Sequence, residues 1–350
     1  MARNNNKLTR RKKVEPSVQT IFLNTPNIPG NSFDSFTCDL SQIASLMNRR
    51  FYRQGINWAV AGMKLITANP ASIIVKKLPS TWVMSNAWEK GFRAWQKMNN
   101  DAISESESVK PKFMDFKIYM DSTHHEDGFV ANLLPIGNSL APYTPGEWTA
   151  SKIVVPNTPP TFGPANEYEL LAVGASYPGA SLPPASGLDA VSLIEGYAAS
   201  RALPDILDPN TPGDAADAEG ATPENWLQAI FNEGTNQDHE VIENLQLDNT
   251  IAPYPFENDG VSTDTQYPNG ANQAPGLQLH DWELVTGTTI GGTTYLKGGM
   301  FPCGLIRFDI SNQVPEENNY IIQIDLVPGN HRGYHCESMT TDRDWETYHL

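Results

Sequence analysis

The fold is organised around residues 39–99, which read DLSQIASLMNRRFYRQGINWAVAGMKLITANPASIIVKKLPSTWVMSNAWEKGFRAWQKMN. Asp39 is a suitable helix N-cap. Apolar residues follow it at the spacing that places side chains on one helical face, namely Leu40, Ile43, Ala44, Met47 and Phe51. Gly55 is a natural stop for such a helix. The pattern therefore predicts a helix that begins after Asp39 and ends before Gly55.

Two strands and a second helix are predicted after this helix. The strands cover 56–67 and 72–78, and we expect them to pair as a hairpin around the turn Ala68-Asn69-Pro70-Ala71. Ser85 is then a cap for the second helix, whose aromatic residues recur at i, i+4 and i+7. These residues are Trp88, Phe92 and Trp95. Three rings on one stripe predict a helical face that is buried against a sheet.

The composition favours strands and turns over helices. The 350 residues include 26 Gly and 27 Pro, and the hydrophobic content of 39% is enough for a sizeable core. Aromatic and β-branched residues cluster in short runs between the turns. Further strands are expected at 113–121, 277–286, 293–296, 305–310 and 320–327. The fold class is therefore all-β, a sandwich with a few helices.

Several classes of protein do not fit the sequence. No run of about 18 apolar residues occurs, and the N-terminus lacks a signal peptide, so neither membrane insertion nor export is expected. Cys38, Cys303 and Cys336 are far apart and odd in number, which predicts reduced thiols. No nucleophile elbow, phosphate-binding loop or metalloprotease motif occurs. We therefore expect no enzyme, no catalytic residue, no cofactor and no metal.

Histidines occur in two places where metal ligation can be considered. The pair His124-His125 leaves a predicted strand, and adjacent side chains of an extended chain point to opposite sides, so a solvated loop is expected. His331 and His335 would lie beside Cys336 on one face if the C-terminal tail were helical, but glycines and a proline around them oppose a helix. Neither place is predicted to bind a metal.

Charge is distributed unevenly along the chain. Residues 1–117 hold 18 Lys and Arg against 8 Asp and Glu, a net charge of +10. Residues 118–350 hold 6 against 32, a net charge of −26, and the whole chain therefore carries −16. An asymmetry of this kind predicts one surface for a polyanion and another that faces solvent.

Residues 1–14 are predicted to form a disordered basic arm that binds nucleic acid. Six basic residues and no acid occur before Val14, namely Arg3, Lys7, Arg10, Arg11, Lys12 and Lys13. Six contacts with single-stranded phosphates would give a salt slope of roughly −4. The alternatives are a solvated tail and a nuclear localisation patch at 10–13.

A second basic group follows the first predicted helix and consists of Arg49, Arg50 and Arg53. We assign these arginines to nucleic-acid binding, with Lys64, Lys76 and Lys77 as additional contacts from an inner face. The alternative is structural. Cations are favoured at a helix C-terminus, and lysines on strand edges discourage edge pairing.

Residues 142–276 differ in character from the rest of the chain. Prolines punctuate short apolar pieces, and six acidic residues fall between 205 and 224. The pattern predicts long, acidic surface loops inserted between strands, interrupted by helices at 188–202 and 223–232.

Three short motifs resemble those of a known family. They are Asp39-Leu40-Ser41-Gln42, Asn48-Arg49-Arg50-Phe51-Tyr52-Arg53-Gln54-Gly55 and Trp82-Val83-Met84-Ser85-Asn86-Ala87-Trp88. Together they resemble capsid proteins of small eukaryotic viruses with circular single-stranded DNA genomes, in particular smacovirus-like and related unclassified circular Rep-encoding viruses. The resemblance is strongest over 15–120, weaker after Gln278 and absent between about 155 and 275.

The resemblance implies an eight-stranded antiparallel jelly roll of the viral capsid type, with a few inserted helices. It implies a structural protein that assembles in about 60 copies into a small icosahedral shell around a circular single-stranded DNA genome. Expected partners are further copies of the chain, single-stranded DNA and a host-cell receptor. The expected location is the virion, with the host nucleus during assembly. The alternative from the residues is a soluble β-sandwich lectin or adhesin, which gives no reason for the basic arm.

The expected organisation has five segments. They are the basic arm at 1–14, the first part of the jelly roll with two helices at 15–141, acidic insertions on the outer surface at 142–276, closing strands at 277–328 and a C-terminal tail at 329–350. In this arrangement the arm faces the genome inside the shell, and the acidic loops face outward and keep shells apart.

Overall fold

The computed structural model describes residues 15–98, 116–155, 166–169, 172–174, 191–194, 276–286 and 290–339. The predicted arm at 1–14, the acidic stretch at 205–224 and the helix predicted at 223–232 lie outside these residues. Of the helix predicted at 188–202, only 191–194 are described, and Val191–Ser192 form the short strand β8 there.

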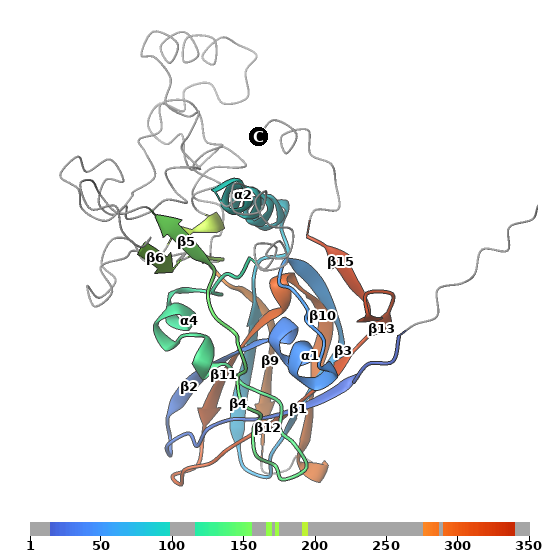
Figure 1. Cartoon of the computed structure of the whole chain (residues 1–350). Coiled ribbons are helices and arrows are strands. Elements are labelled where there is room, and N and C mark those ends of the chain that lie inside the picture. Colours follow the sequence, from blue (N-terminus) through green and yellow to red (C-terminus); the bar gives the residue numbers. More distant parts are fainter. Residues whose placement is uncertain are drawn as a thin grey trace, which may run out of the picture.

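Two antiparallel sheets form a sandwich (Figure 1). The first sheet has the strand order β1 (Thr20–Asn24), β12 (Ile321–Leu326), β3 (Ile56–Ile66) and β10 (Thr293–Phe301). β15 (Cys336–Ser338) joins it by pairing with the start of β3. The second sheet has the order β2 (Phe33–Asp39), β11 (Leu305–Asn312), β4 (Ala71–Lys77) and β9 (Gln278–Val285). The predicted all-β sandwich with few helices is thus confirmed.

The main strands pair according to their position along the chain. Taken in chain order, the eight strands β1 to β4 and β9 to β12 pair first with eighth, second with seventh, third with sixth and fourth with fifth. The predicted hairpin of 56–67 with 72–78 is therefore wrong. β3 pairs with β10 and β12, whereas β4 pairs with β11 and β9. The two strands turn their apolar faces toward each other across the core, so they lie in opposite sheets.

The core lies between the sheets and follows the two-residue period of the strands. Met63 and Leu65 of β3 are buried, whereas Lys64 between them faces outward. Phe308 and Ile310 of β11 belong to the same buried cluster. At about 25 cal/mol per Å² of apolar surface, such clusters are the main source of folding stability.

The closing strands were predicted correctly, except for one turn. A turn was expected at 297–299, but β10 continues through these residues to Phe301. A Cβ atom at Gly298 would lie 2.3 Å from the carbonyl oxygen of Ala61. Gly298 therefore allows a close approach of two strand backbones, which is another use of glycine within a strand.

Helix α1 (Leu40–Asn48) begins as predicted and ends earlier. Oδ1 of Asp39 accepts hydrogen bonds from the backbone N–H groups of Ser41 at 2.8 Å and Gln42 at 3.4 Å, which confirms the N-cap. The helix ends at Asn48 and the next residue, Arg49, is left-handed. Phe51, which was predicted on the apolar helical face, therefore lies outside the helix.

Helix α2 (Trp82–Met98) begins before the predicted cap Ser85 and lies at one end of the sandwich (Figure 1). Trp88 and Trp95 are buried, and their rings lie 6.0 and 5.7 Å from that of Phe116. The predicted burial of the aromatic stripe is confirmed, but its partner is not a sheet. The described part of the strand predicted at 113–121 forms no strand, and residues 116–120 run beneath α2 instead.

A buried polar network anchors these residues to the sandwich. The predicted loop at 123–128 is wrong, because Ser122–Asp127 form the short helix α4 and His124 is buried. Nδ1 of His124 accepts from the N–H of Met120 at 2.9 Å, so Nε2 carries the proton and donates to Oδ1 of Asn132 at 2.8 Å. Nδ2 of Asn132 donates to Oε1 of Gln42 at 2.9 Å. The network thereby reaches the first turn of α1.

The remaining described elements are short. They are η3 (Phe129–Ala131), β5 (Lys152–Val155), β6 (Asn166–Glu169), β7 (Ala172–Val173), η4 (Ile290–Gly292), η5 (Pro302–Gly304), β13 (Pro328–Gly329) and β14 (Gly333–Tyr334). All three cysteines are free thiols, as predicted. Among the described residues, no helix is long and apolar enough to cross a membrane.

Candidate nucleic-acid interface

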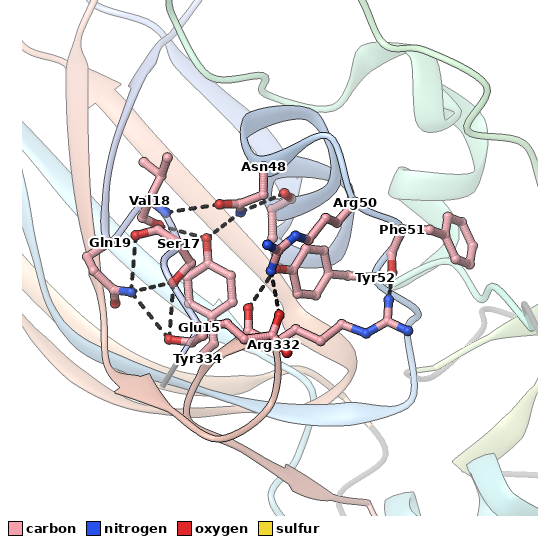
Figure 2. Close-up of polar contacts among 12 residues, drawn as sticks. Glu15, Ser17, Val18, Gln19, Asn48, Arg50, Phe51, Tyr52, Arg332 and Tyr334 are labelled. Carbon is pink, nitrogen blue, oxygen red and sulfur yellow. Dashed lines mark hydrogen bonds and ion pairs between the residues drawn. The ribbon is translucent and has the colours of Figure 1, made fainter. Parts of the chain in front are cut away.

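Residues 15–19 lie against the C-terminal strands, beside the end of α1 (Figure 2). The hydroxyl of Ser17 donates to the carbonyl oxygen of Gly333 at 3.1 Å, and the hydroxyl of Tyr334 donates to that of Val18 at 2.7 Å. The N–H of Val18 donates to Oδ1 of Asn48 at 3.0 Å. Residues 1–14 therefore join the fold at Glu15, which lies beside Arg50 in the loop that follows α1.

The loop that follows α1, residues 49–53, carries the three arginines predicted as binding residues, and we name it the arginine loop. Arg49 and Arg50 are exposed, and Arg53 is half-buried. One guanidinium nitrogen of Arg50 lies 2.6 Å from the carboxylate of Glu15 (Figure 2). Both side chains of this ion pair are largely exposed, so its contribution to stability is small. The three arginines lie beyond the helix and are not its last-turn cations.

Arg332 was not predicted and lies at the same surface. Its guanidinium donates to the carbonyl oxygen of Phe51 (Figure 2). A signal existed in the sequence, because Arg332 is one of only 6 basic residues in the acidic segment 118–350. Its place beside the arginine loop follows only from the pairing of the C-terminal strands. The folded domain thus collects four arginines near the point where the basic segment 1–14 ends and the fold begins.

Buried aromatic residues fix the position of the arginine loop. Tyr52 is only 1% exposed, and its hydroxyl donates to the carbonyl oxygen of Arg332 at 2.9 Å. Its ring lies 5.8 Å from that of Trp58 and 5.6 Å from that of Tyr334. The N–H of Tyr52 also donates to Oγ of Ser45 at 2.9 Å. The loop is therefore held on the sandwich and presents its charges from a fixed backbone.

Two of these arginines have a strained backbone. Arg49 and Arg332 have φ angles of 52° and 48°, in the left-handed region that favours glycine. Glycine is the usual residue after a helix end. A glycine would fit the backbone at both positions with less strain.

The three lysines assigned to an inner face do not join the arginines. Lys64 lies 3.7 Å from Asp325 on the outer face of the first sheet, and Lys76 lies 2.6 Å from Asp309 on the outer face of the second sheet. Lys77 is buried, and its Nζ donates to the carbonyl oxygen of Met300 at 3.0 Å. The three lysines therefore do not share one surface, because β3 and β4 lie in opposite sheets and the side chain of Lys77 points into the core. Which of them line the inner face of a shell stays a prediction.

The six arm residues Arg3, Lys7, Arg10, Arg11, Lys12 and Lys13 lie outside the described residues. His331 and His335 are described, and the segment around them forms the strands β14 and β15, not a helix. His331 and His335 therefore do not lie one turn apart on one helix. Within the described part of the chain, no group of three or more His, Cys, Asp and Glu side chains is arranged to hold a metal ion.

No family model matches the chain. The searches of curated proteins and of solved structures also find no match. What this surface can do therefore follows from its own residues. Arginine is always charged at neutral pH and presents a planar set of donors that suits phosphate oxygens.

Proposed function

We propose that this chain is the capsid protein of a small virus with a circular single-stranded DNA genome. In this proposal the chain folds as a jelly roll and assembles with itself into a closed icosahedral shell. The arginine loop, Arg332 and residues 1–14 contact the nucleic acid. The role is structural and includes no catalysis.

The pairing of the eight strands carries this proposal. In a long antiparallel ribbon of eight strands, the first strand pairs with the eighth and the fourth with the fifth. When this ribbon is rolled up, it gives two facing four-stranded sheets. This is the strand arrangement of a jelly roll, which occurs in viral capsid and lectin domains. The observed orders β1-β12-β3-β10 and β2-β11-β4-β9 support that assignment.

The basic surface favours a capsid protein over a lectin. Four arginines lie where residues 1–14, with six basic side chains, join the fold. Neutralisation of phosphates by such groups releases counterions and gives binding that is independent of sequence. A packaged genome needs this kind of binding, whereas a lectin has no use for it.

An exposed apolar surface supports contacts between copies of the chain. Trp282 of β9 is 63% exposed, and it lies opposite Ile74 on the outer face of the second sheet. Leu279 and Leu284 of the same strand are also exposed on this face and complete the patch. Contiguous apolar patches typically mark interfaces between proteins. We assign this patch to a second copy, because a shell subunit must bury surface against its neighbours.

Light scattering during size exclusion tests the assembly. We expect the full-length chain to elute as a particle of many copies and Trp282→Ser to elute mainly as free subunits. Tyr295→Ser is the matched control, because Tyr295 is an equally exposed ring on the outer face of the first sheet, and it should assemble normally. A monomer or dimer of the unmodified chain at every salt concentration and pH would contradict the proposal and favour a lectin-like protein.

Deletion of residues 2–13 tests the arm. We expect the fold and the shell to persist and the particles to lose most of their nucleic acid. Particles that still carry full-length DNA after this deletion would contradict a packaging role for the arm.

A further inference from the structure

An aromatic ring lies exposed within the arginine loop. Phe51 is 45% exposed, and its ring points away from the hydrogen bonds that hold the loop (Figure 2). A single exposed phenylalanine is common on protein surfaces. Phe51 differs because Arg49 and Arg50 precede it directly. In addition, the guanidinium of Arg332 donates a hydrogen bond to the carbonyl oxygen of Phe51.

Phe51 is held from behind by a second aromatic residue. Its ring lies 6.3 Å from that of Trp148, which is buried. Nζ of Lys117 lies 4.5 Å from the centre of the Trp148 ring and 5.9 Å from that of Phe51. The ring is therefore supported on one side by Trp148 and Lys117, while the remainder is open to solvent.

We propose that Phe51 is a stacking platform for an unpaired base of single-stranded nucleic acid. The arginines beside it hold the phosphates on either side of that base. Every base has a flat π-face, so stacking tolerates any sequence, and a base within a duplex cannot reach the ring. This inference rests on the proposed function and adds single-strand selectivity to it.

Fluorescence anisotropy with labelled oligo(dT) and oligo(U) tests the platform in full-length subunits. Removal of one base–aromatic stack corresponds to a loss of about 5-fold to 150-fold in affinity, and we expect this loss for Phe51→Ala. The slope of affinity against salt should stay unchanged, because the ring neutralises no phosphate. Phe51→Trp should bind like the wild type, and a duplex should bind equally well to all variants. The two oligonucleotides distinguish a preference for DNA or RNA.

Two controls separate stacking from a structural role of the ring. Phe51→Leu keeps an apolar contact with Trp148 but cannot stack, so it should bind as weakly as Phe51→Ala. Phe22→Ala removes another exposed ring, on β1, and should bind like the wild type. Normal binding by Phe51→Leu, or an equal loss on duplex, would overturn the platform.

Failure of the stacking platform and failure of the proposed function give different results. If Phe51→Ala binds single strands normally while the wild type forms particles that contain nucleic acid, only the platform is wrong. If the wild type neither assembles nor binds nucleic acid, the proposed function is wrong as well.

Discussion

The two ends of helix α1 use polar side chains in opposite ways. At the N-terminal end, Asp39 is buried and accepts from Nε2 of Gln54 at 2.7 Å, and Gln42 accepts from Asn132. At the C-terminal end, Arg49 and Arg50 are exposed, and Arg49 has a left-handed backbone. The first end is satisfied internally and the second is directed outward.

The difference separates groups that hold the fold from groups that are free to bind. Unpaired buried polar groups cost about 1 to 3 kcal/mol each, so a buried network is stable only when each member has its partner. An exposed arginine contributes little to the fold, and even the Arg50–Glu15 pair is exposed enough to be exchanged for a phosphate. The following experiments act on one end and should leave the other unchanged.

Asn132→Leu should have the largest effect on stability. It removes the acceptor of the His124 ring N–H and the donor to Oε1 of Gln42, both of which are buried. We expect a loss of about 4 kcal/mol in the free energy of unfolding, measured with urea. Asn138→Leu, at an exposed position, is the control and should change stability little. A loss equal to that of the control would show that the network does not hold α1.

Two buried groups of the network should respond to pH in opposite directions. Burial lowers the pKa of His124 to about 3 and raises the pKa of Asp39 to about 6. The contribution of His124 is complete above its ordinary pKa of about 6.5 and is lost as the pH falls toward 3. The contribution of Asp39 is complete below its ordinary pKa near 3.8 and is lost as the pH rises through 6.

Single variants should separate the pH dependence of stability that comes from His124 from the one that comes from Asp39. Each group should change the free energy of unfolding by up to about 3 kcal/mol between pH 4 and 6.5. Relative to the wild type, His124→Gln should become more stable as the pH is lowered from 6.5 to 4, and Asp39→Asn should become less stable. Urea unfolding across this pH range measures the change. If the free energies of unfolding of the wild type and both variants changed with pH in parallel, His124 and Asp39 would not be the source of these dependences.

Gly333→Ala should loosen residues 15–19 from the C-terminal strand β14. A Cβ atom there would lie 2.4 Å from Oγ of Ser17, at a φ of +103°. Gly291→Ala is a matched control, because Gly291 also has a positive φ but nothing lies within 4 Å of its Cβ position. We expect Gly333→Ala to cost about 2 kcal/mol more than the control and to speed hydrogen exchange in residues 15–19. Equal effects of both variants would exclude the docking contact as the cause.

Arg49→Gly should have the smallest effect on stability and act on binding instead. Glycine relieves the left-handed backbone, so we expect a free energy of unfolding that is unchanged or raised by about 1 kcal/mol. The salt slope for single-stranded DNA should become shallower by about 0.7, because one phosphate contact is lost. An unchanged slope would show that Arg49 does not contact the nucleic acid.

Local patterns in the sequence predicted local structure well. The two-residue period gave most strands of the sandwich, and Asp39 was correctly predicted as the cap of α1 because both depend on neighbours in the sequence. The end of α1 depends on distant groups. Oδ1 of Asn48 accepts from Val18, and Nδ2 of Asn48 donates to the hydroxyl of Tyr334. No local signal reports such contacts, and the helix was therefore predicted too long.

The candidate site was predicted in part for the same reason. The arginines at 49, 50 and 53 stand out by charge, whereas Arg332 joins them only through the pairing of distant strands. His124 was expected in a solvated loop because its partner Asn132 and the next member of the network, Gln42, cannot be recognised from the sequence. The sheet to which a strand belongs also depends on distant partners. β3 and β4 are neighbours in the chain, but they lie in opposite sheets.

Negative-stain electron microscopy of the purified full-length chain decides between a closed shell and a small oligomer. The ratio of absorbance at 260 and 280 nm, measured on the same fraction, reports whether nucleic acid is inside. We expect closed round particles of uniform diameter and a ratio that is raised by packaged nucleic acid. Dispersed small oligomers with the ratio of pure protein would contradict the shell and the nucleic-acid interface together.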